Sequence, residues 1–253
     1  MRPFIRRLCS TLLGGALLVS LLACGSGGKP GLNVSAAASL RKAFTSYGQG
    51  FTQAHARFSF AGSDALAAQI EQGIRPDVFA SANTKLPDAL FAKGLVERPV
   101  VFAANRLVLA VPKGSKIASI ADLERPGVSI ALGTPTVPVG AYSEKVLARL
   151  TLARRRVLLA NVKDREPDVT GIVGKLTEGA VGAGFLYATD VTAAGGKLRA
   201  IALPPALQPQ VAYGIAIVKG THHRSEARAF IAGLLSGAGR AELLAGGFLA
   251  PPR

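Results

Sequence analysis

From Leu32 onward, the sequence alternates short apolar segments with longer amphipathic ones. The apolar segments have the length and composition of strands, and the helical segments between them place apolar residues three or four positions apart. The predicted strands are Leu32–Ala37, Arg57–Ala61, Asp77–Ala80, Arg106–Val111, Val128–Leu132, Val181–Tyr187 and Val211–Val218. Strands that alternate with helices of about 10–15 residues are typical of α/β folds. We therefore predict an α/β architecture with mainly parallel sheets.

Two of the predicted strands are placed to carry the chain between two lobes. The chain would leave the first lobe along Arg106–Val111 and return to it along Ala212–Val218. We therefore predict a first lobe made of residues 31–107 and 214–253, and a second lobe made of residues 108–213, joined by two hinge crossings. The cleft between two such lobes is a preferred site for a small ligand.

The N-terminal segment has the features of an export signal. Met1–Arg7 carries three arginines and no acid, and Leu8–Ala23 is almost wholly apolar but short for a membrane span. The segment ends in Leu-Leu-Ala before Cys24, which resembles the bacterial lipobox, where the cysteine is lipidated and becomes the first mature residue. We predict a signal peptide over 1–23, a lipidated tether over 24–30, and an exported protein anchored by lipid to the bacterial membrane. An ordinary cleaved signal and a short anchor helix are the alternatives.

The net charge and the cysteines narrow the classes of partner. The formal charge is +15, with 30 Lys and Arg against 15 Asp and Glu, and the chain stays strongly basic without the three arginines of the signal. An exported protein does not ordinarily meet nucleic acid, so we expect no nucleic-acid partner. The basic surface then indicates anionic lipid headgroups or the steering of anionic solutes. Cys9 leaves with the signal and Cys24 carries the lipid, which excludes a disulfide scaffold.

Two serines lie between a predicted strand and the helix that follows it. Ser39 follows Ala36–Ala38, and Ser63 follows Gly62. In a parallel sheet such turns share the edge where ligands bind, and each serine offers a hydroxyl and a backbone N–H near the positive end of a helix dipole. The turns therefore predict an anion site that uses no cationic side chain. The alternative is that both serines are ordinary helix N-caps.

Several short stretches between Leu32 and Lys219 occur together in the order and spacing of one known family. They resemble the molybdate-binding receptors of bacterial ABC importers, which are type II periplasmic binding proteins. The stretches are Ala36–Leu40, Phe60–Ser63, Gln69–Gly73, Asp77–Ala82, Val137–Gly140 with Tyr142, Asp168–Val169 and Gly184–Asp190.

This resemblance implies a receptor that holds a tetrahedral oxyanion, molybdate or tungstate, between its lobes through hydrogen bonds alone. Ser39 and Ser63 would each offer a hydroxyl and an N–H, Val139 and Val169 a backbone N–H, and Tyr187 its hydroxyl. Such a dianion carries no proton near neutral pH and only accepts hydrogen bonds, which suits a site made of donors. Molybdenum would be bound only as the oxyanion, without a cofactor. We expect a monomer that delivers the ion to an ABC permease.

Asp64 departs from the family pattern, which usually has a small or hydroxyl residue after the second serine. At the start of a helix an aspartate is favoured by the helix dipole and points into solvent. A carboxylate that faced the cleft would instead repel an unprotonated dianion and accept the proton of HPO4²⁻. A receptor for phosphate or sulfate is therefore an alternative.

Two further function classes stay open at this point. A surface-anchored serine hydrolase would use Ser39 or Ser63 as its nucleophile, but the sequence has no G-x-S-x-G elbow and no histidine placed near either serine. A basic adhesion or polyanion-binding protein would use the positive charge instead. We expect no enzymatic activity, because the receptor interpretation needs no covalent step.

Overall fold

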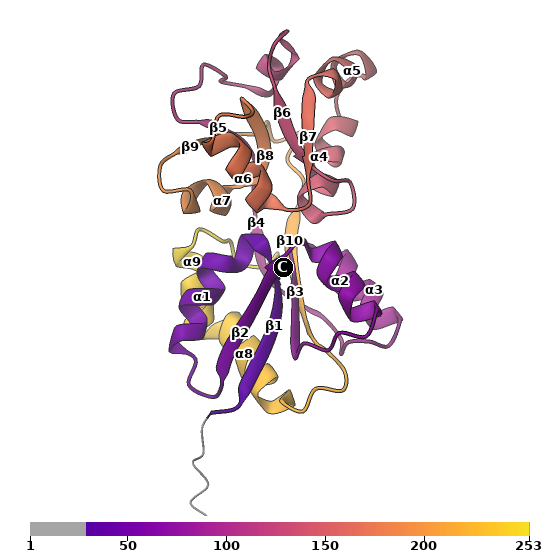
Figure 1. Ribbon diagram of the computed structural model, residues 1–253, viewed down its shortest axis with the longest axis vertical. Helices are drawn as coiled ribbons and strands as arrows, with labels where there is room; N and C mark the ends of the chain where they lie inside the picture. Colours follow the sequence, from indigo (N-terminus) through magenta and orange to yellow (C-terminus); the bar gives the residue numbers. More distant parts are fainter. Residues whose placement is uncertain (1–28, 253) are drawn as a thin grey trace, which may run out of the picture.

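A computed structural model describes residues 29–252, which form two α/β lobes stacked along the long axis of the molecule (Figure 1). The predicted signal peptide and the lipidation site at Cys24 lie outside these residues. None of the helices between residues 29 and 252 combines the length and the apolar character that crossing a bilayer requires.

The first lobe is built on a five-stranded sheet with the strand order β2-β1-β3-β10-β4. Its strands are β1 (Gly31–Ala37), β2 (His55–Ala61), β3 (Val78–Ser81), β4 (Val100–Asn105) and β10 (Val211–Ile217). β1 runs parallel to both β2 and β3, whereas β10 runs antiparallel to β3 and β4.

Helices cover this sheet with two separate apolar clusters. Phe44 of α1 (Arg41–Gly50) and Phe230 of α8 (Arg224–Ser236) are fully buried and pack edge to face, with ring centroids 5.6 Å apart. α9 (Ala238–Ala245) packs against α1 and α8. A second cluster joins Ile70 of α2 (Ser63–Glu71) and Leu90 of α3 (Lys85–Ala92) to Phe79 of β3. The helices thus pack on the faces of the sheet and leave the carboxyl ends of its parallel strands uncovered at the junction of the lobes.

The second lobe repeats this design with the strand order β7-β6-β8-β5-β9. Its strands are β5 (Leu107–Pro112), β6 (Ile130–Gly133), β7 (Val162–Glu166), β8 (Ala183–Tyr187) and β9 (Leu198–Ala202). β6 is parallel to β7 and β8, and β5 is antiparallel to β8 and β9. The helices are α4 (Pro138–Ala148), α5 (Leu152–Ala160), α6 (Val169–Thr177) and α7 (Ala188–Ala193), with short 3₁₀ helices η1 (Ala38–Leu40) in the first lobe and η2 (Ile120–Glu124) in the second.

The predicted fold class, two α/β lobes joined by two crossings, is confirmed, and each sheet is mixed because one of its five strands runs against the other four. In each sheet the antiparallel pairs involve the strand that arrives from the other lobe, β10 in the first and β5 in the second. Such a strand starts at the cleft, where the parallel strands end, so it runs in the opposite direction to them. The mixed topology is therefore a direct consequence of crossing twice between the lobes.

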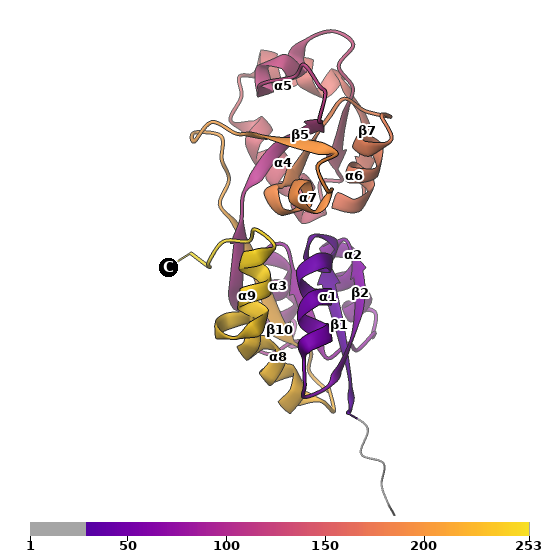
Figure 2. The same cartoon turned by 90° about the vertical axis from the view of Figure 1, so that its left-hand side faces the viewer.

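The two crossings lie side by side (Figures 1 and 2). The first is the single residue Arg106 between β4 and β5, and the second is the segment 203–210 between β9 and β10. Strand pairing places Leu107 opposite Tyr187 in the second sheet and Val211 opposite Asn105 in the first. The division expected from sequence, after residues 107 and 213, differs from these crossings by a few residues.

Candidate ligand-binding site

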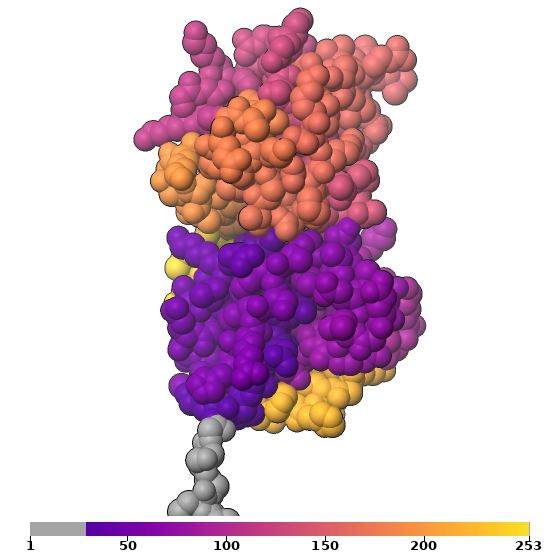
Figure 3. Space-filling view, viewed as in Figure 1, coloured from indigo at the N-terminus to yellow at the C-terminus, as the bar shows by residue number. Residues whose placement is uncertain are grey.

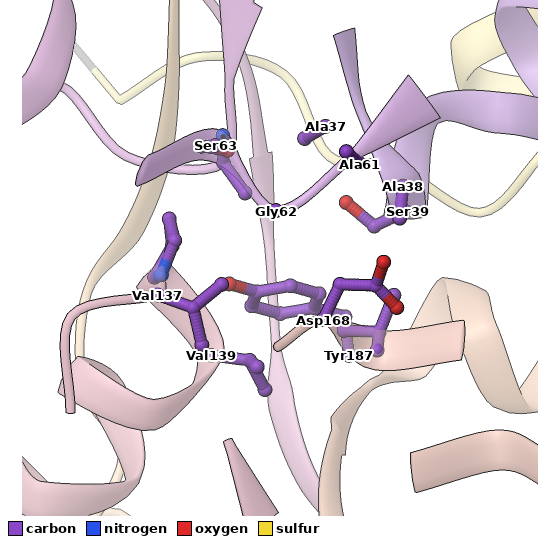
Figure 4. A pocket seen from close by; sticks show the side chains of 13 residues that line it. Ala37, Ala38, Ser39, Ala61, Gly62, Ser63, Val137, Val139, Asp168 and Tyr187 are labelled. Atoms are coloured by element: carbon purple, nitrogen blue, oxygen red, sulfur yellow. Dashed lines mark hydrogen bonds between the residues drawn. The ribbon is translucent and has the colours of Figure 1, made fainter. Parts of the chain in front are cut away.

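The carboxyl ends of the parallel strands in the two sheets face each other across the junction of the lobes. Segments that follow β1, β2 and β3 in the first lobe, and β6, β7 and β8 in the second, meet there around one small cavity (Figure 4). It is lined by Ala37, Ala38, Ser39, Ala61, Gly62, Ser63, Ala82, Val137, Pro138, Val139, Asp168, Val169 and Tyr187. All five residues predicted to bind the ligand, Ser39, Ser63, Val139, Val169 and Tyr187, are among them.

The cavity is small and lies where the two lobes meet. Its volume is about 10 Å³, close to the ~10–15 Å³ that a single water molecule needs. The space-filling view shows the two lobes touching along a seam across the middle of the molecule (Figure 3). A cavity of this size holds about one water molecule, so even a tetrahedral oxyanion would enter only with the lobes further apart.

Neither serine is a helix N-cap, so the N-cap alternative is wrong. Ser63 is the first residue of α2, whose N-cap is Gly62, and Ser39 lies within η1; neither helix has a side-chain cap. The Ser63 Oγ instead accepts a hydrogen bond from the Ala82 N–H at 3.1 Å. The Ser39 Oγ lies 3.0 Å from the Tyr213 hydroxyl. Both hydroxyls are thus held by other elements and are exposed to the cavity.

Four helices, η1, α2, α4 and α6, begin at the cavity, so their first backbone N–H groups lie at its edge. These groups have no acceptor within their own helix and lie at the positive end of the helix dipole. Val139 follows Pro138 in the first turn of α4, and Val169 is the first residue of α6. Both valine side chains are buried, so packing fixes the positions of their N–H groups.

Tyr187 has a buried hydroxyl that lacks a hydrogen-bond partner. It is the last residue of β8, and its ring lies between Asp168 and Val139 at the cavity (Figure 4). Its hydroxyl is the only buried side-chain polar atom without a hydrogen-bond partner in the part of the chain that the structure describes. Burial raises the pKa of this hydroxyl well above its ordinary value, so it stays a donor. Leaving it unpaired costs about 1–3 kcal/mol, a cost that a ligand oxygen in the cavity would remove.

Asp64 does not face the ligand. Its Oδ2 accepts a hydrogen bond of 2.6 Å from the Thr136 hydroxyl, which belongs to the loop before α4 in the other lobe. The carboxylate therefore ties the lobes together beside the cavity, and Asp64 is not one of the lining residues. Gly62 marks the same close approach, because a Cβ there would lie 2.5 Å from the Pro167 carbonyl oxygen of the second lobe.

The carboxylate that does line the cavity is Asp168, to which the resemblance assigned no role in binding. It is the N-cap of α6, and its Oδ1 accepts the N–H groups of Thr170 at 2.6 Å and Gly171 at 3.3 Å. These bonds leave the N–H of Val169 for the cavity. An aspartate directly before a helical pattern predicts such a cap, but the cap alone does not reveal that the other face of the carboxyl group borders a ligand site.

The cavity offers an anion N–H and hydroxyl dipoles but no cationic side chain, and the charged residue among the described lining is Asp168. Of residues 29–252, no lysine, arginine or histidine lines it. Within the same range, no three His, Cys, Asp or Glu side chains come together in a group that could hold a metal ion. The basic residues nearest in sequence, Arg41 and Lys42, line a neighbouring and larger cavity with Ser39, where both are exposed. They can draw anions toward the cleft without entering the site.

Asp190 is a buried acid directly behind Tyr187. Its Oδ2 accepts the Tyr187 N–H at 3.0 Å, which closes a capping box at the start of α7. Burial raises the pKa of this carboxyl from 3.8 to about 7. The residue thus fixes the end of β8 from which the Tyr187 ring projects.

Comparisons with known proteins agree with this geometry. The model of the bacterial extracellular solute-binding protein family matches residues 32–249. The molybdate-binding protein ModA of Mycobacterium tuberculosis is 34% identical over 262 residues, which cover 96% of this chain and 98% of that protein. YvgL of Bacillus subtilis, a putative ABC transporter substrate-binding lipoprotein, is 31% identical over 240 residues, covering 90% and 89%.

Among solved structures, the periplasmic molybdate-binding protein of Azotobacter vinelandii superposes with a TM-score of 0.76. The match covers 87% of this chain and 100% of that one at 22% sequence identity. At this identity the likeness concerns the fold, which is the two-lobed arrangement described above.

The raised pKa of Asp190 predicts a pH dependence of stability. Between pH 3.8 and about 7 the folded protein keeps a proton that the unfolded chain releases, so stability falls as pH rises through this window. The loss of folding stability is absent below this pH window and reaches about 4 kcal/mol above it. Asp190→Asn keeps the acceptor for the Tyr187 N–H and should remove this component, as measured by urea unfolding at several pH values.

Asp122→Asn is the matched control, because hydrogen bonds from the Ala118 and Ser119 backbone lower the pKa of Asp122. Asp122→Asn should be less stable than wild type at pH values above the titration of Asp122, whereas Asp190→Asn should be more stable than wild type at high pH. Parallel pH profiles for wild type and Asp190→Asn would contradict the assignment.

Proposed function

The chain belongs to the family of bacterial extracellular solute-binding proteins, and we propose that it is a molybdate and tungstate receptor of an ABC importer. The fold is that of a type II periplasmic binding protein, with the ligand enclosed between two lobes. Capture of the ion by lobe closure would give a closed shape that the permease recognises.

The observation that carries the proposal is the unpaired Tyr187 hydroxyl in a cavity lined by donors. Molybdate and tungstate are unprotonated dianions, so every oxygen accepts hydrogen bonds and none donates. Two serine hydroxyls, the first N–H groups of four helices and one tyrosine hydroxyl match that requirement. Charge-assisted hydrogen bonds of this type are stronger than neutral ones, and a closed cavity strengthens them further.

The alternative of a serine hydrolase finds no base in the site. The described lining residues include no histidine, so neither Ser39 nor Ser63 has an imidazole beside it to take its proton. Asp168, the carboxylate at the cavity, is occupied as a helix cap by the N–H groups of Thr170 and Gly171. The site is therefore better suited to binding than to acyl transfer.

Attachment to the membrane is part of the proposal. The lipobox-like sequence before Cys24 supports a lipid anchor on the outer side of the cytoplasmic membrane. A lipoprotein name is also carried by the B. subtilis relative. A tether of residues 24–30 would hold a monomeric receptor close to the permease, which raises its effective concentration there.

Thermal unfolding with four oxyanions tests the ligand. Molybdate and tungstate, each at a thousandfold excess over Kd, should stabilise the protein by about 4 kcal/mol, while sulfate and phosphate should leave the midpoint almost unchanged. A response to sulfate or phosphate alone would retain the receptor class and change the ligand. No response to any of the four would refute the proposal.

Removal of either serine hydroxyl should weaken molybdate binding. Ser39→Ala and Ser63→Ala each delete a donor to the ligand, at an expected loss of about 1–3 kcal/mol in calorimetric titration. Ser129→Ala is the matched control, since its Oγ accepts the Gly182 N–H at 3.0 Å, just as Ser63 accepts that of Ala82, but outside the cavity. Unchanged affinity in both cavity variants would place the site elsewhere.

Tyr187→Phe should move stability and affinity in opposite directions. The ligand-free variant should be at least as stable as wild type, because it no longer buries an unpaired hydroxyl, while molybdate affinity should fall by about 1–3 kcal/mol. In Tyr47→Phe the lost hydroxyl donates to the Phe230 carbonyl at 3.2 Å, far from the cavity. That control should lose about 1 kcal/mol of stability and keep its affinity. A Tyr187→Phe variant that is less stable but binds normally would refute the role of the hydroxyl.

A further inference from the structure

A hydrogen-bond network lies behind the Ser39 side of the cavity, on the two strands that cross between the lobes. It consists of Ser39, Asn105, Thr189 and Tyr213, and we call it the hinge network. Asn105 is the last residue of β4, Tyr213 lies in β10, and Thr189 belongs to α7 of the second lobe. Asn105, Thr189 and Tyr213 are all buried, with 5%, 4% and 0% of their surface exposed.

The amide of Asn105 fixes the donor in two of the bonds. The Asn105 Oδ1 accepts the Arg106 N–H at 2.9 Å, which sets the orientation of the amide. Its Nδ2 therefore donates to the Thr189 Oγ1 at 2.9 Å and to the Tyr213 hydroxyl at 3.4 Å. The Tyr213 hydroxyl lies 3.0 Å from the Ser39 Oγ, where either hydroxyl can donate, and a Tyr213 that accepts from Asn105 has its own hydrogen to donate to Ser39.

This direction matters for an acceptor-only ligand. A Ser39 hydroxyl that accepts from Tyr213 keeps its own hydrogen for the cavity, whereas one that donated to Tyr213 would turn a lone pair toward the anion. Burial raises the pKa of Tyr213 well above its ordinary value, so the phenol keeps the hydrogen that it donates. The phenol ring is held by edge-to-face contacts with Phe102, Tyr187 and Phe248, at centroid distances of 6.2, 5.8 and 5.4 Å.

We propose that Tyr213 is a positioning residue that orients the Ser39 hydroxyl as a donor to the bound oxyanion, and that Asn105 and Thr189 hold it in that role. The proposal rests on the proposed function, because it concerns the same ligand. Thr189 comes from the second lobe and Asn105 from the first, so the bond between them joins the two lobes beside the cavity.

A double-mutant cycle tests the proposal with molybdate as the probe in calorimetric titration. Tyr213→Phe should weaken binding about three- to tenfold, which corresponds to one neutral hydrogen bond. In the Ser39→Ala background the same substitution should change affinity less than twofold, since the hydroxyl on which it acts is gone. A residue with only a structural role would instead reduce affinity equally in both backgrounds.

Tyr47→Phe is the control for loss of a buried tyrosine hydroxyl, because its partner is the Phe230 carbonyl within the first lobe. It should bind as wild type in both backgrounds. Should Tyr213→Phe fail to fold, Thr189→Val is the alternative variant, because it removes the acceptor that holds the Asn105 amide next to Tyr213. It should weaken binding about twofold, again only when Ser39 is present.

The outcomes separate the two proposals. Wild-type protein that binds neither molybdate nor tungstate refutes the proposed function and this inference with it. Wild-type protein that binds, together with variants that bind normally or with equal losses in both backgrounds, overturns the role of Tyr213 alone.

Discussion

A doubly charged ion in a closed cavity must find every hydrogen bond that it had in water, because an ion left without them costs many kcal/mol in a medium of low dielectric constant. In the proposed site, four helix N-termini and three hydroxyls would supply these hydrogen bonds, and no cationic side chain of the described residues lines the cavity. The ligand-free protein has a related penalty, because the buried Tyr187 hydroxyl has no acceptor. A bound oxyanion would accept from that hydroxyl, which would reduce both the desolvation penalty of the ion and the penalty of the unpaired donor.

The topology of the chain makes this meeting of helix ends possible. Each sheet contains three parallel strands whose carboxyl ends point at the other lobe, and the antiparallel strands β5 and β10 are those that arrive from the other lobe. Because both crossings pass close to the cavity, residues of the hinge and residues of the site share contacts. Two hydrogen bonds show this most clearly: one joins Ser39 to Tyr213 of β10, and the other joins Asn105 of β4 to Thr189.

Local sequence patterns predicted the buried strands of the fold and the two strand-to-helix turns that carry the serines of the site. Ser39 and Ser63 follow central or neighbouring strands in short strand-to-helix turns, and these turns were expected at one sheet edge. The strands β4, β7 and β9 were missed, and each lies at an edge of its sheet. β7 reads Val-Lys-Asp-Arg-Glu and is only partly buried, so it has no apolar pattern to indicate a strand.

The residues that sequence reasoning missed act over long separations. Tyr213 reaches Ser39 across 174 positions, and Asp64 meets Thr136 across 72, so no window of sequence contains either pair. The roles that the resemblance implies for Val139, Val169 and Tyr187 likewise had no local signal, because a backbone N–H is present at every residue except proline. What distinguishes these positions is where the fold places them, at the first turn of a helix or at the end of a strand.

Selectivity among tetrahedral oxyanions then depends on the direction of hydrogen bonds rather than on net charge. Ser63 accepts from Ala82, and Ser39 lies against Tyr213, so the oxygens of both serines are engaged on the side away from the cavity. A ligand oxygen that carries a proton needs an acceptor, and the Asp168 carboxylate is the acidic group of the described lining. Its Oδ1 already accepts two N–H groups of α6. A carboxylate at the cavity repels every dianion but offers an acceptor only to a ligand that carries a proton, so the proposed preference for molybdate over phosphate depends on the donors outnumbering this acceptor.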